Sequence, residues 1–299
     1  MATAAPTFDL QSHSVHSDGA LAPADVVAAA AAAGVELLAL TDHDTTAGVP
    51  EALDAARVAG IDVVSAVEIT ASFEERHDLH VLGYLIDPAD VGLETVLAHS
   101  RSDRERRAER MADALRELGF ELNDAALAQR SAQGKTIGRP HLAQAVVDRV
   151  ENRPRLEAEG VQDPTDFLVR YLIEGTPAFR PREAPTVREA IALIHDAGGV
   201  AVWAHPFWDI SAPDAVLRAI DQFRAAGLDG VEAFYVTHSE AQTRLVADRC
   251  AELGLLTTGS SDFHGLAHHT FCRFRAFSTY GMTPALGPLM RCSRRGPRR

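Results

Sequence analysis

The sequence predicts an α/β fold, a barrel of alternating strands and helices that is interrupted by a helical insertion. Strand-like and helix-like segments alternate from the N-terminus to residue 84. Residues 90–172 are instead helical in pattern and highly charged, and the alternation returns from residue 187 onward. Consecutive β-α-β units favour a largely parallel sheet with right-handed crossovers. We therefore expect one interrupted barrel rather than two tandem domains.

The first part of the chain is expected to form four strands and two helices. Short apolar runs predict the strands, and the alanine-rich segments that stop at Gly34 and Gly60 predict the helices. A polar loop containing His16-Ser17-Asp18-Gly19 follows the first strand. The expected strands cover residues 8–12, 35–40, 61–69 and 79–85, and the expected helices cover residues 22–33 and 46–59.

After the insertion, the same rhythm predicts three more helices and three more strands. The expected helices cover residues 187–197, 212–226 and 239–253, and the expected strands cover residues 199–204, 229–234 and 255–260. The resulting domain prediction is a discontinuous barrel of residues 1–89 and 176–290 around a helical insertion of residues 90–175. The basic tail, residues 291–299, is expected to be disordered.

Composition limits the classes of partner and compartment. The 299 residues are 46% hydrophobic and 24% charged, which is typical of a globular protein with a real core. A formal net charge of −13 disfavours binding to long nucleic acid but is compatible with a small phosphorylated substrate. No membrane span or secretion signal is visible, and three cysteines without a CxxC pair predict no disulfide framework. We expect a cytoplasmic protein with no membrane partner and no obligate protein partner.

Histidines and carboxylates cluster beside the predicted strands. The clusters are residues 9–19, Thr41-Asp42-His43-Asp44, Val67-Glu68 with His80, Ala204-His205-Pro206, and Ser261-Asp262-Phe263-His264-Gly265. Each is expected at a strand end, and the carboxyl ends of parallel barrel strands form one face, so the clusters can converge there. Imidazoles and carboxylates bind divalent transition metals well. Ordinary core or surface histidines are the alternative for any single cluster, but their joint placement predicts a metal site.

The ordered motifs D-L-x-x-H-S-x-x-S-D-G, T-D-H-D, V-E, H-V-L-G-Y, A-H-P and S-D-F-H-G resemble the polymerase and histidinol phosphatase (PHP) family. The likeness is greatest to members that act on nucleoside 3′,5′-bisphosphates or on short RNA 5′ ends. It covers nearly the whole chain, including Gly138-Arg139-Pro140-His141 in the insertion. The resemblance implies a distorted (β/α)₇ barrel of the PHP type with two or three divalent ions, manganese ahead of iron or zinc.

The resemblance also implies which side chains hold these ions. The first position would take Gln11, His13, Glu68 and Asp262, the second Glu68, His80 and His205, and the third Asp18, His43 and His264. Among these ligands, Glu68, His205, Asp262 and His264 are also expected to be catalytic. Asp42 is expected to orient His43, because ligating imidazoles usually donate their other N–H to an acceptor.

Gln11 departs from the family pattern, which usually has histidine at this place. A neutral amide is a much poorer ligand for a transition metal than an imidazole. The hypothesis is that the first metal position is weak, exchangeable or filled only with substrate present. His16, three residues beyond His13, is the residue that would compensate.

The implied activity is hydrolysis of a phosphate monoester by metal-activated hydroxide. The expected substrate is a small phosphorylated metabolite, most plausibly a nucleotide such as a nucleoside 3′,5′-bisphosphate. A phosphodiesterase or 5′-3′ exoribonuclease acting on short oligonucleotides is the alternative enzyme. A catalytically silent metal-binding regulatory PHP domain is the alternative from another class, and Gln11 is its only support.

Three residues outside the metal set are expected to bind substrate. Arg139 presents a fork that matches phosphate oxygens, and His141 lies beside it, although Arg139 could instead only cap a helix that starts near Pro140. His238 follows a predicted strand and is a candidate for contact with substrate or for proton donation to the leaving group.

Three aromatic residues flank His205 in the sequence. The alternation of its strand places Trp203 in the core. Phe207 and Trp208 are also expected in the core, with stacking on a nucleobase as the alternative for either of them.

Overall fold

The computed structural model describes residues 6–132 and 137–294. The chain forms two compact units, one from the segments up to residue 98 and from residue 184 onward, and the other from residues 99–183. We call them the barrel unit and the helical unit. The domain boundaries expected near residues 90 and 175 stay a prediction.

Seven strands form the sheet of the barrel unit, and their order in the sheet follows their order in the sequence. They are β1 (Phe8–Asp9), β2 (Leu37–Leu40), β3 (Asp62–Phe73), β4 (Arg76–Tyr84), β5 (Val200–Trp203), β6 (Gly230–Tyr235) and β7 (Leu256–Ser260). The first and last strands approach each other, since the Leu10 amide donates a hydrogen bond to the Gly259 carbonyl at 3.1 Å. The predicted α/β barrel is therefore confirmed as a nearly closed seven-stranded barrel.

One strand runs against the rest. β4 is antiparallel to both β3 and β5, whereas every other neighbouring pair is parallel. Only Glu74 and Glu75 separate β3 from β4, and a connection this short can only join antiparallel strands. β3 also continues four residues beyond the predicted end at residue 69. The expectation of a largely parallel sheet is confirmed outside β4.

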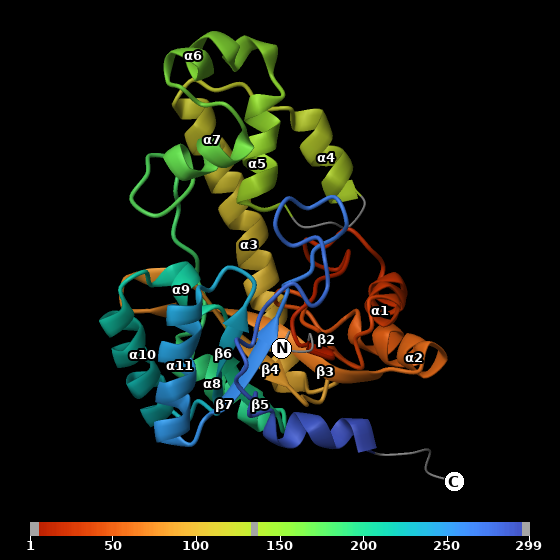
Figure 1. The fold of residues 1–299 in the computed structure, drawn as a ribbon. Coiled ribbons are helices and arrows are strands. Elements are labelled where there is room, and N and C mark those ends of the chain that lie inside the picture. The colour runs from red at the N-terminus through yellow and green to blue at the C-terminus, as the bar shows by residue number, and fades with distance from the viewer. Residues whose placement is uncertain (1–5, 133–136, 295–299) are drawn as a thin grey trace. The chain divides into compact units, whose positions relative to one another are not determined.

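Helices cover the outside of the barrel. The barrel-unit helices are α1 (Pro23–Ala32), α2 (Val49–Ala59), α8 (Val187–Asp196), α9 (Pro206–Asp209), α10 (Pro213–Ala225) and α11 (Glu240–Leu253), with the 3-10 helix η2 (Gly287–Arg294) near the C-terminus. In Figure 1, α1 and α2 lie beside β2 and β3, α11 lies beside β6 and β7, and α10 packs against α11. Local signals set their ends: Thr186 with Glu189 and Ser239 with Gln242 form capping boxes at α8 and α11.

The core of the barrel unit confirms the expectation for Trp203. This side chain is fully buried and packs edge to face against Phe223, with ring centroids 5.0 Å apart. Burying a large aromatic ring in the barrel contributes strongly to stability.

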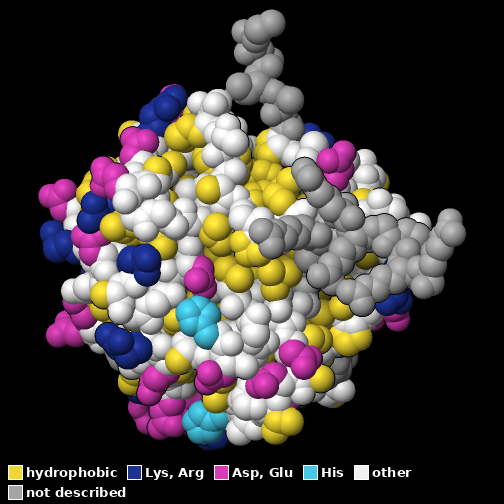
Figure 2. Space-filling model, turned by 90° about the horizontal axis from the view of Figure 1, so that it is seen from below, with side chains coloured by type: hydrophobic (Ala, Val, Ile, Leu, Met, Phe, Trp, Pro, Cys, Tyr) yellow, Lys and Arg dark blue, Asp and Glu magenta, His cyan; other side chains and the backbone are white. Residues whose placement is uncertain are grey.

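Figure 2 shows the molecule from below the view of Figure 1. Hydrophobic side chains gather in the middle of that face, while charged side chains lie mainly around its margin.

The helical unit has its own core. Its helices are α3 (Val91–Glu117), which begins in the barrel unit, then α4 (Asp124–Ala132), α5 (Arg139–Val147), α6 (Arg153–Ala158) and α7 (Pro164–Tyr171), with the 3-10 helix η1 (Val150–Asn152) before α6. Phe120, Phe167 and Tyr171 form an aromatic cluster with ring centroids 4.8–5.1 Å apart. The expected helical content of residues 90–172 is confirmed.

The predicted tail, residues 291–299, begins inside η2, and its last five residues lie outside the described residues. Among the described helices, none combines the length and the apolar character that crossing a bilayer requires.

Candidate metal centre

Glu68 is the fully buried carboxylate around which the predicted ligands gather. Its Oε1 lies 2.8 Å from His80 Nδ1 and 3.3 Å from His205 Nε2. Its Oε2 lies 3.2 Å from His13 Nε2 and 3.5 Å from His43 Nδ1. The two oxygens of one side chain thus face two different groups of imidazoles.

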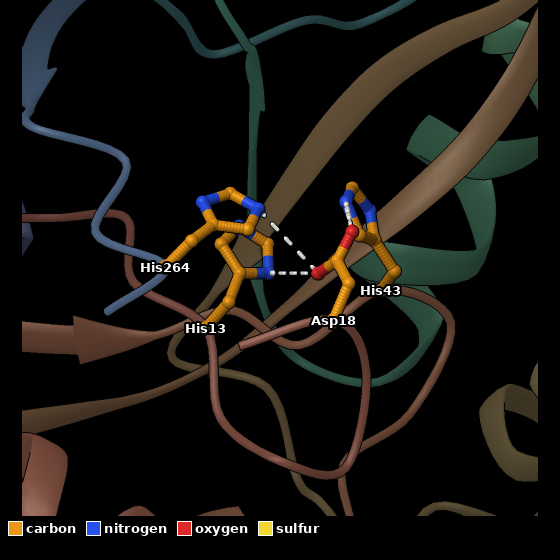
Figure 3. A group of neighbouring side chains, drawn as sticks. All are labelled: His13, Asp18, His43 and His264. Atoms are coloured by element: carbon orange, nitrogen blue, oxygen red, sulfur yellow. Dashed lines mark ion pairs between the residues drawn. The ribbon is translucent and has the colours of Figure 1, made fainter. Parts of the chain in front are cut away.

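A second group of ligands surrounds Asp18 (Figure 3). Asp18 Oδ1 lies 3.4 Å from His264 Nε2 and 3.7 Å from His13 Nδ1, and Asp18 Oδ2 lies 3.6 Å from His43 Nε2. These four residues offer ligand atoms within 4.8 Å of one another. Because His13 and His43 each point one ring nitrogen toward Asp18 and the other toward Glu68, the two groups form one continuous centre.

The five imidazoles of this centre lie in a row. Successive ring centroids are 4.2–5.2 Å apart in the order His264, His13, His43, His80 and His205. His13 Nε2, His43 Nδ1 and Asp262 Oδ1 are buried without a hydrogen bond, although His13 Nε2 lies only 3.0 Å from Asp262 Oδ1. Buried polar atoms are normally paired, so these atoms fit a centre that closes around cations. The donor set fits divalent ions that accept nitrogen and oxygen ligands.

The two carboxylates Glu68 and Asp262 and the imidazole of His43 are in the forms that suit cation binding. Burial opposes ionisation of Glu68, but the neighbouring His43 and His80 hold its pKa well below the ordinary value. Burial likewise opposes ionisation of Asp262, while His264 and His13 lower its pKa to about 2. Burial lowers the pKa of His43 to about 3. Ionised carboxylates and a neutral imidazole are the forms that bind a metal ion.

The loop after β1 positions His13 and Asp18. Asp42 accepts hydrogen bonds from the Ser14 amide at 2.7 Å, from Ser14 Oγ at 2.6 Å and from Ser17 Oγ at 2.7 Å. The expectation that Asp42 orients His43 is therefore wrong, because its hydrogen bonds hold the loop instead. Glycine is needed at position 19, where a Cβ would lie 2.2 Å from the His13 carbonyl oxygen.

Two of the predicted ligand residues, at the ends of barrel strands, have a left-handed backbone. His205 follows β5 with φ of 29°, and Asp262 follows β7 with φ of 53°. Non-glycine residues rarely adopt positive φ, and such strain persists only where surrounding contacts impose it. The His205 amide donates a hydrogen bond to Glu232 Oε2 at 3.0 Å, and Asp262 Oδ2 accepts one from the Tyr235 hydroxyl at 2.7 Å.

Glu68 and His80 lie within strands, so the expectation that every cluster follows a strand end is wrong for this pair. Glu68 pairs with Leu82 in the β3–β4 ladder, and His80 pairs with Thr70. Two residues that are diagonal across an antiparallel pair share one face of the sheet. The hairpin therefore brings together the carboxylate and the imidazole.

Gln11 lies beside Glu68. Its Nε2 donates a hydrogen bond to Glu68 Oε2 at 3.0 Å, and its Oε1 accepts one from Ser260 Oγ at 3.3 Å. The side chain is buried. His16 is exposed and belongs to neither of the candidate metal groups found among the described residues.

Sequence reasoning missed Glu232, a fully buried carboxyl on β6. It accepts hydrogen bonds from Ser260 Oγ and from the His205 amide, and burial raises its pKa to about 8. A single acidic residue within the otherwise apolar run of residues 230–235 was the available signal, because glutamate is almost never fully buried without a partner.

The predicted substrate residues lie in different parts of the fold. Arg139 and His141 begin α5 in the helical unit, where His141 Nδ1 accepts a hydrogen bond from the Gly138 amide at 3.0 Å. His141 also lines a cavity of about 360 Å³ between residues of α4 and α5. His238 is buried in the barrel unit beside Tyr235 and Phe207, with its Nδ1 3.2 Å from the Ala233 carbonyl oxygen.

The core expectation is wrong for Trp208. Phe207 packs against the barrel core, but the next residue, Trp208, is 60% exposed. The two residues lie in the short helix α9, where neighbouring side chains point in different directions. Phe207 therefore packs into the core, and Trp208 faces solvent.

Comparisons with known proteins agree with this centre. Residues 9–101 match the PHP domain model. The chain is 35% identical over 257 residues to the 3′,5′-nucleoside bisphosphate phosphatase of Chromobacterium violaceum, covering 86% of this chain and 87% of that protein. It is 34% identical to a 5′-3′ exoribonuclease of Haemophilus influenzae, covering 86% and 89%.

A solved structure supports the same relationship. The structure of an amidohydrolase from Chromobacterium violaceum with bound sulfate matches with a TM-score of 0.77 and 31% identity, covering 96% of each chain. The sequence and the fold of this chain are therefore both similar to those of that protein over nearly the full length. The chain belongs to the PHP family of metal-dependent phosphoesterases and is a phosphoric ester hydrolase.

Proposed function

We propose that the protein hydrolyses a phosphate monoester of a nucleotide, with a nucleoside 3′,5′-bisphosphate as the best candidate substrate. The observation that carries the proposal is the convergence of imidazoles on both oxygens of the single buried carboxylate of Glu68. The 35% identical relative named as a 3′,5′-nucleoside bisphosphate phosphatase supports this choice of substrate.

The proposal assigns three cation positions. The distances support a first position between His13, Glu68 and Asp262, a second between Glu68, His80 and His205, and a third between Asp18, His43 and His264. Manganese is the proposed ion, with iron and zinc as the alternatives, because these side chains accept all three. When bound, such ions lower the pKa of a water molecule and neutralise phosphoryl oxygens.

Gln11 makes the first position the weak one. Its N–H group is directed at Glu68 Oε2, the oxygen that also faces His13. A hydrogen-bond donor cannot ligate a cation, so Gln11 competes with an ion for this oxygen. We therefore propose that the second and third positions hold their ions firmly, whereas the ion at the first position exchanges.

The remaining side chains would bind substrate. Arg139 is the proposed phosphate ligand, since its guanidinium matches two phosphate oxygens, and His141 is the proposed neighbour. For His238, burial lowers the pKa to about 4. Donation of its Nδ1 proton to the Ala233 carbonyl leaves Nε2 as an acceptor, so we assign His238 to receive a hydrogen bond from a substrate hydroxyl.

The second candidate function is stepwise cleavage of short oligonucleotides. The relative named as a 5′-3′ exoribonuclease, at 34% identity, favours it. The net charge of −13 disfavours long polymers, because an acidic surface repels a phosphate backbone. The two candidates share the same cations and differ in the ester that is cleaved.

Phosphate release tests the proposal directly. Purified protein with added Mn²⁺ is expected to release inorganic phosphate from adenosine 3′,5′-bisphosphate faster than it cleaves a dinucleotide. Chelation should stop the release, and Asp262→Ala should abolish it. Faster cleavage of the dinucleotide would favour the exoribonuclease, and no activity on either compound would overturn both candidates.

A further inference from the structure

We propose that Trp208, supported from behind by the buried Phe271, forms a shelf on which the base of the substrate stacks beside the metal centre. We call these two residues the aromatic shelf. The inference deepens the proposed function, on which it rests, because it names the part of the substrate that is recognised besides the phosphate.

The exposure of Trp208 is the first observation. Its side chain is 60% exposed, whereas the other tryptophan, Trp203, is fully buried. A large aromatic side chain that is exposed beside a candidate metal centre can stack on a flat ligand. Trp208 is therefore available to a ligand.

The position of the shelf is the second observation. The ring of Trp208 lies 5.9 Å from that of Phe271 and 6.5 Å from that of His205. The ring of Phe271 lies 5.5 Å from that of His264. The two shelf residues therefore lie next to His205 and His264, the imidazoles at the two ends of the row. A nucleotide whose base stacks on the shelf can place its phosphate at the metal centre.

Backbone contacts fix both shelf residues to the metal centre. The Trp208 amide donates a hydrogen bond to the His205 carbonyl at 2.8 Å. The His264 amide donates one to the Phe271 carbonyl at 2.9 Å, and His268 Nδ1 accepts one from the Phe271 amide at 3.0 Å. A rigid platform loses little entropy when a ligand binds, which favours specific stacking.

The chemistry of the shelf selects a flat ring. The buried ring of Tyr235 lies 6.2 Å from that of Phe271, so the shelf is part of a larger aromatic group. Every nucleobase has a π-face, so stacking on such a surface recognises a base without selecting one of the four. The expected specificity is for nucleotides over sugar phosphates, with tolerance of the base.

Kinetics of the manganese-loaded enzyme test the shelf. The ratio of kcat/KM for adenosine 3′,5′-bisphosphate to that for ribose 5-phosphate should fall by about 5- to 150-fold in Trp208→Ala, mainly through KM for the nucleotide. Trp208→Phe should restore most of the ratio. The matched control is Val58→Ala on α2, an exposed apolar residue for which no change is expected. A ratio within twofold of the wild-type value in Trp208→Ala would overturn the shelf.

Fluorescence separates the shelf from the hydrolytic activity. Adenosine carries the base but no phosphate ester, so it cannot be turned over. It should quench the fluorescence of the wild-type protein, while Trp208→Phe, which emits only from the buried Trp203, should not respond. Quenching that persists in Trp208→Phe, or is absent in the wild type, overturns the shelf. Failure of the wild type to hydrolyse either ester overturns only the proposed function.

Discussion

The amide of Gln11 donates a hydrogen bond to the same carboxylate, Glu68, that lies against His80 and His205. Glu68 is thus held on one side by an amide N–H, which cannot ligate a cation, and on the other by imidazoles, which can. This asymmetry distinguishes the proposed first metal position from the proposed second one.

Gln11→His should strengthen the first metal position. An imidazole there supplies a nitrogen ligand in place of an N–H donor. Loss of even an outer hydrogen-bond partner costs metal affinity 10- to 100-fold, so the gain of a direct ligand should be at least about tenfold. Counting manganese after desalting should give about one more ion per chain in Gln11→His than in the wild type.

The control for this experiment is His16→Gln. His16 is exposed and lies outside both candidate metal groups, so its replacement should leave the manganese content unchanged. A loss of manganese in His16→Gln would show that His16 compensates for Gln11. Full, tight occupancy of three ions in the wild type would show that Gln11 does not weaken the site.

Divalent ions should stabilise the folded chain. The predicted ligands come from six strands and loops, so only the folded state presents them together. Binding stabilises that state by about 2.7 kcal/mol at a hundredfold excess over Kd. Saturating Mn²⁺ should raise Tm by about 5 °C or more over the chelated protein. Glu68→Gln should lose most of this increase, whereas Glu240→Gln on the exposed start of α11 should keep it. An equal increase in Glu68→Gln would place the ions elsewhere.

The sequence predicts much of the fold because each helix and strand carries a local signal. The glycines that end helices, such as Gly60 and Gly254, have φ of 71° and 67°. These left-handed residues are readable as helix stops without any tertiary information. The direction of β4 was not readable in this way, because the apolar pattern of residues 79–85 is the same for either direction and only the length of the turn before it decides.

In the candidate site too, the residues in local sequence motifs could be predicted, and the contacts that depend on tertiary structure could not. Residues such as His13 and His264 stand out because imidazoles and carboxylates cluster in short motifs. The contacts of Asp42 and Glu232 could not be predicted, because both act through backbone amides of residues elsewhere in the chain. The exposure of Trp208 likewise depends on how one turn leaves β5.

Glu232 should prove to be a positioning residue for His205. Glu232→Ala leaves the buried His205 amide without its acceptor, which should lower the free energy of unfolding by about 1–3 kcal/mol. Because His205 has a strained backbone there, affinity for Mn²⁺ should also fall, by about 10- to 100-fold in calorimetric titration. Glu232→Gln, which keeps an acceptor oxygen, should recover most of this affinity. Unchanged affinity in Glu232→Ala would limit the residue to a structural role.

His238 should make the protein sensitive to acid. Burial lowers the pKa of its imidazole from 6.5 to about 4, so between these values the unfolded chain binds the proton and the folded chain does not. Stability from this residue is therefore present above pH 6.5 and is lost as the pH falls toward 4, by about 3 kcal/mol in total. His238→Asn can keep the hydrogen bond to the Ala233 carbonyl without titrating. Denaturant unfolding of both chelated proteins should show their stabilities converging by this amount between pH 7 and 4. A constant difference across that range would show that the pKa of His238 is the same in the folded and the unfolded chain.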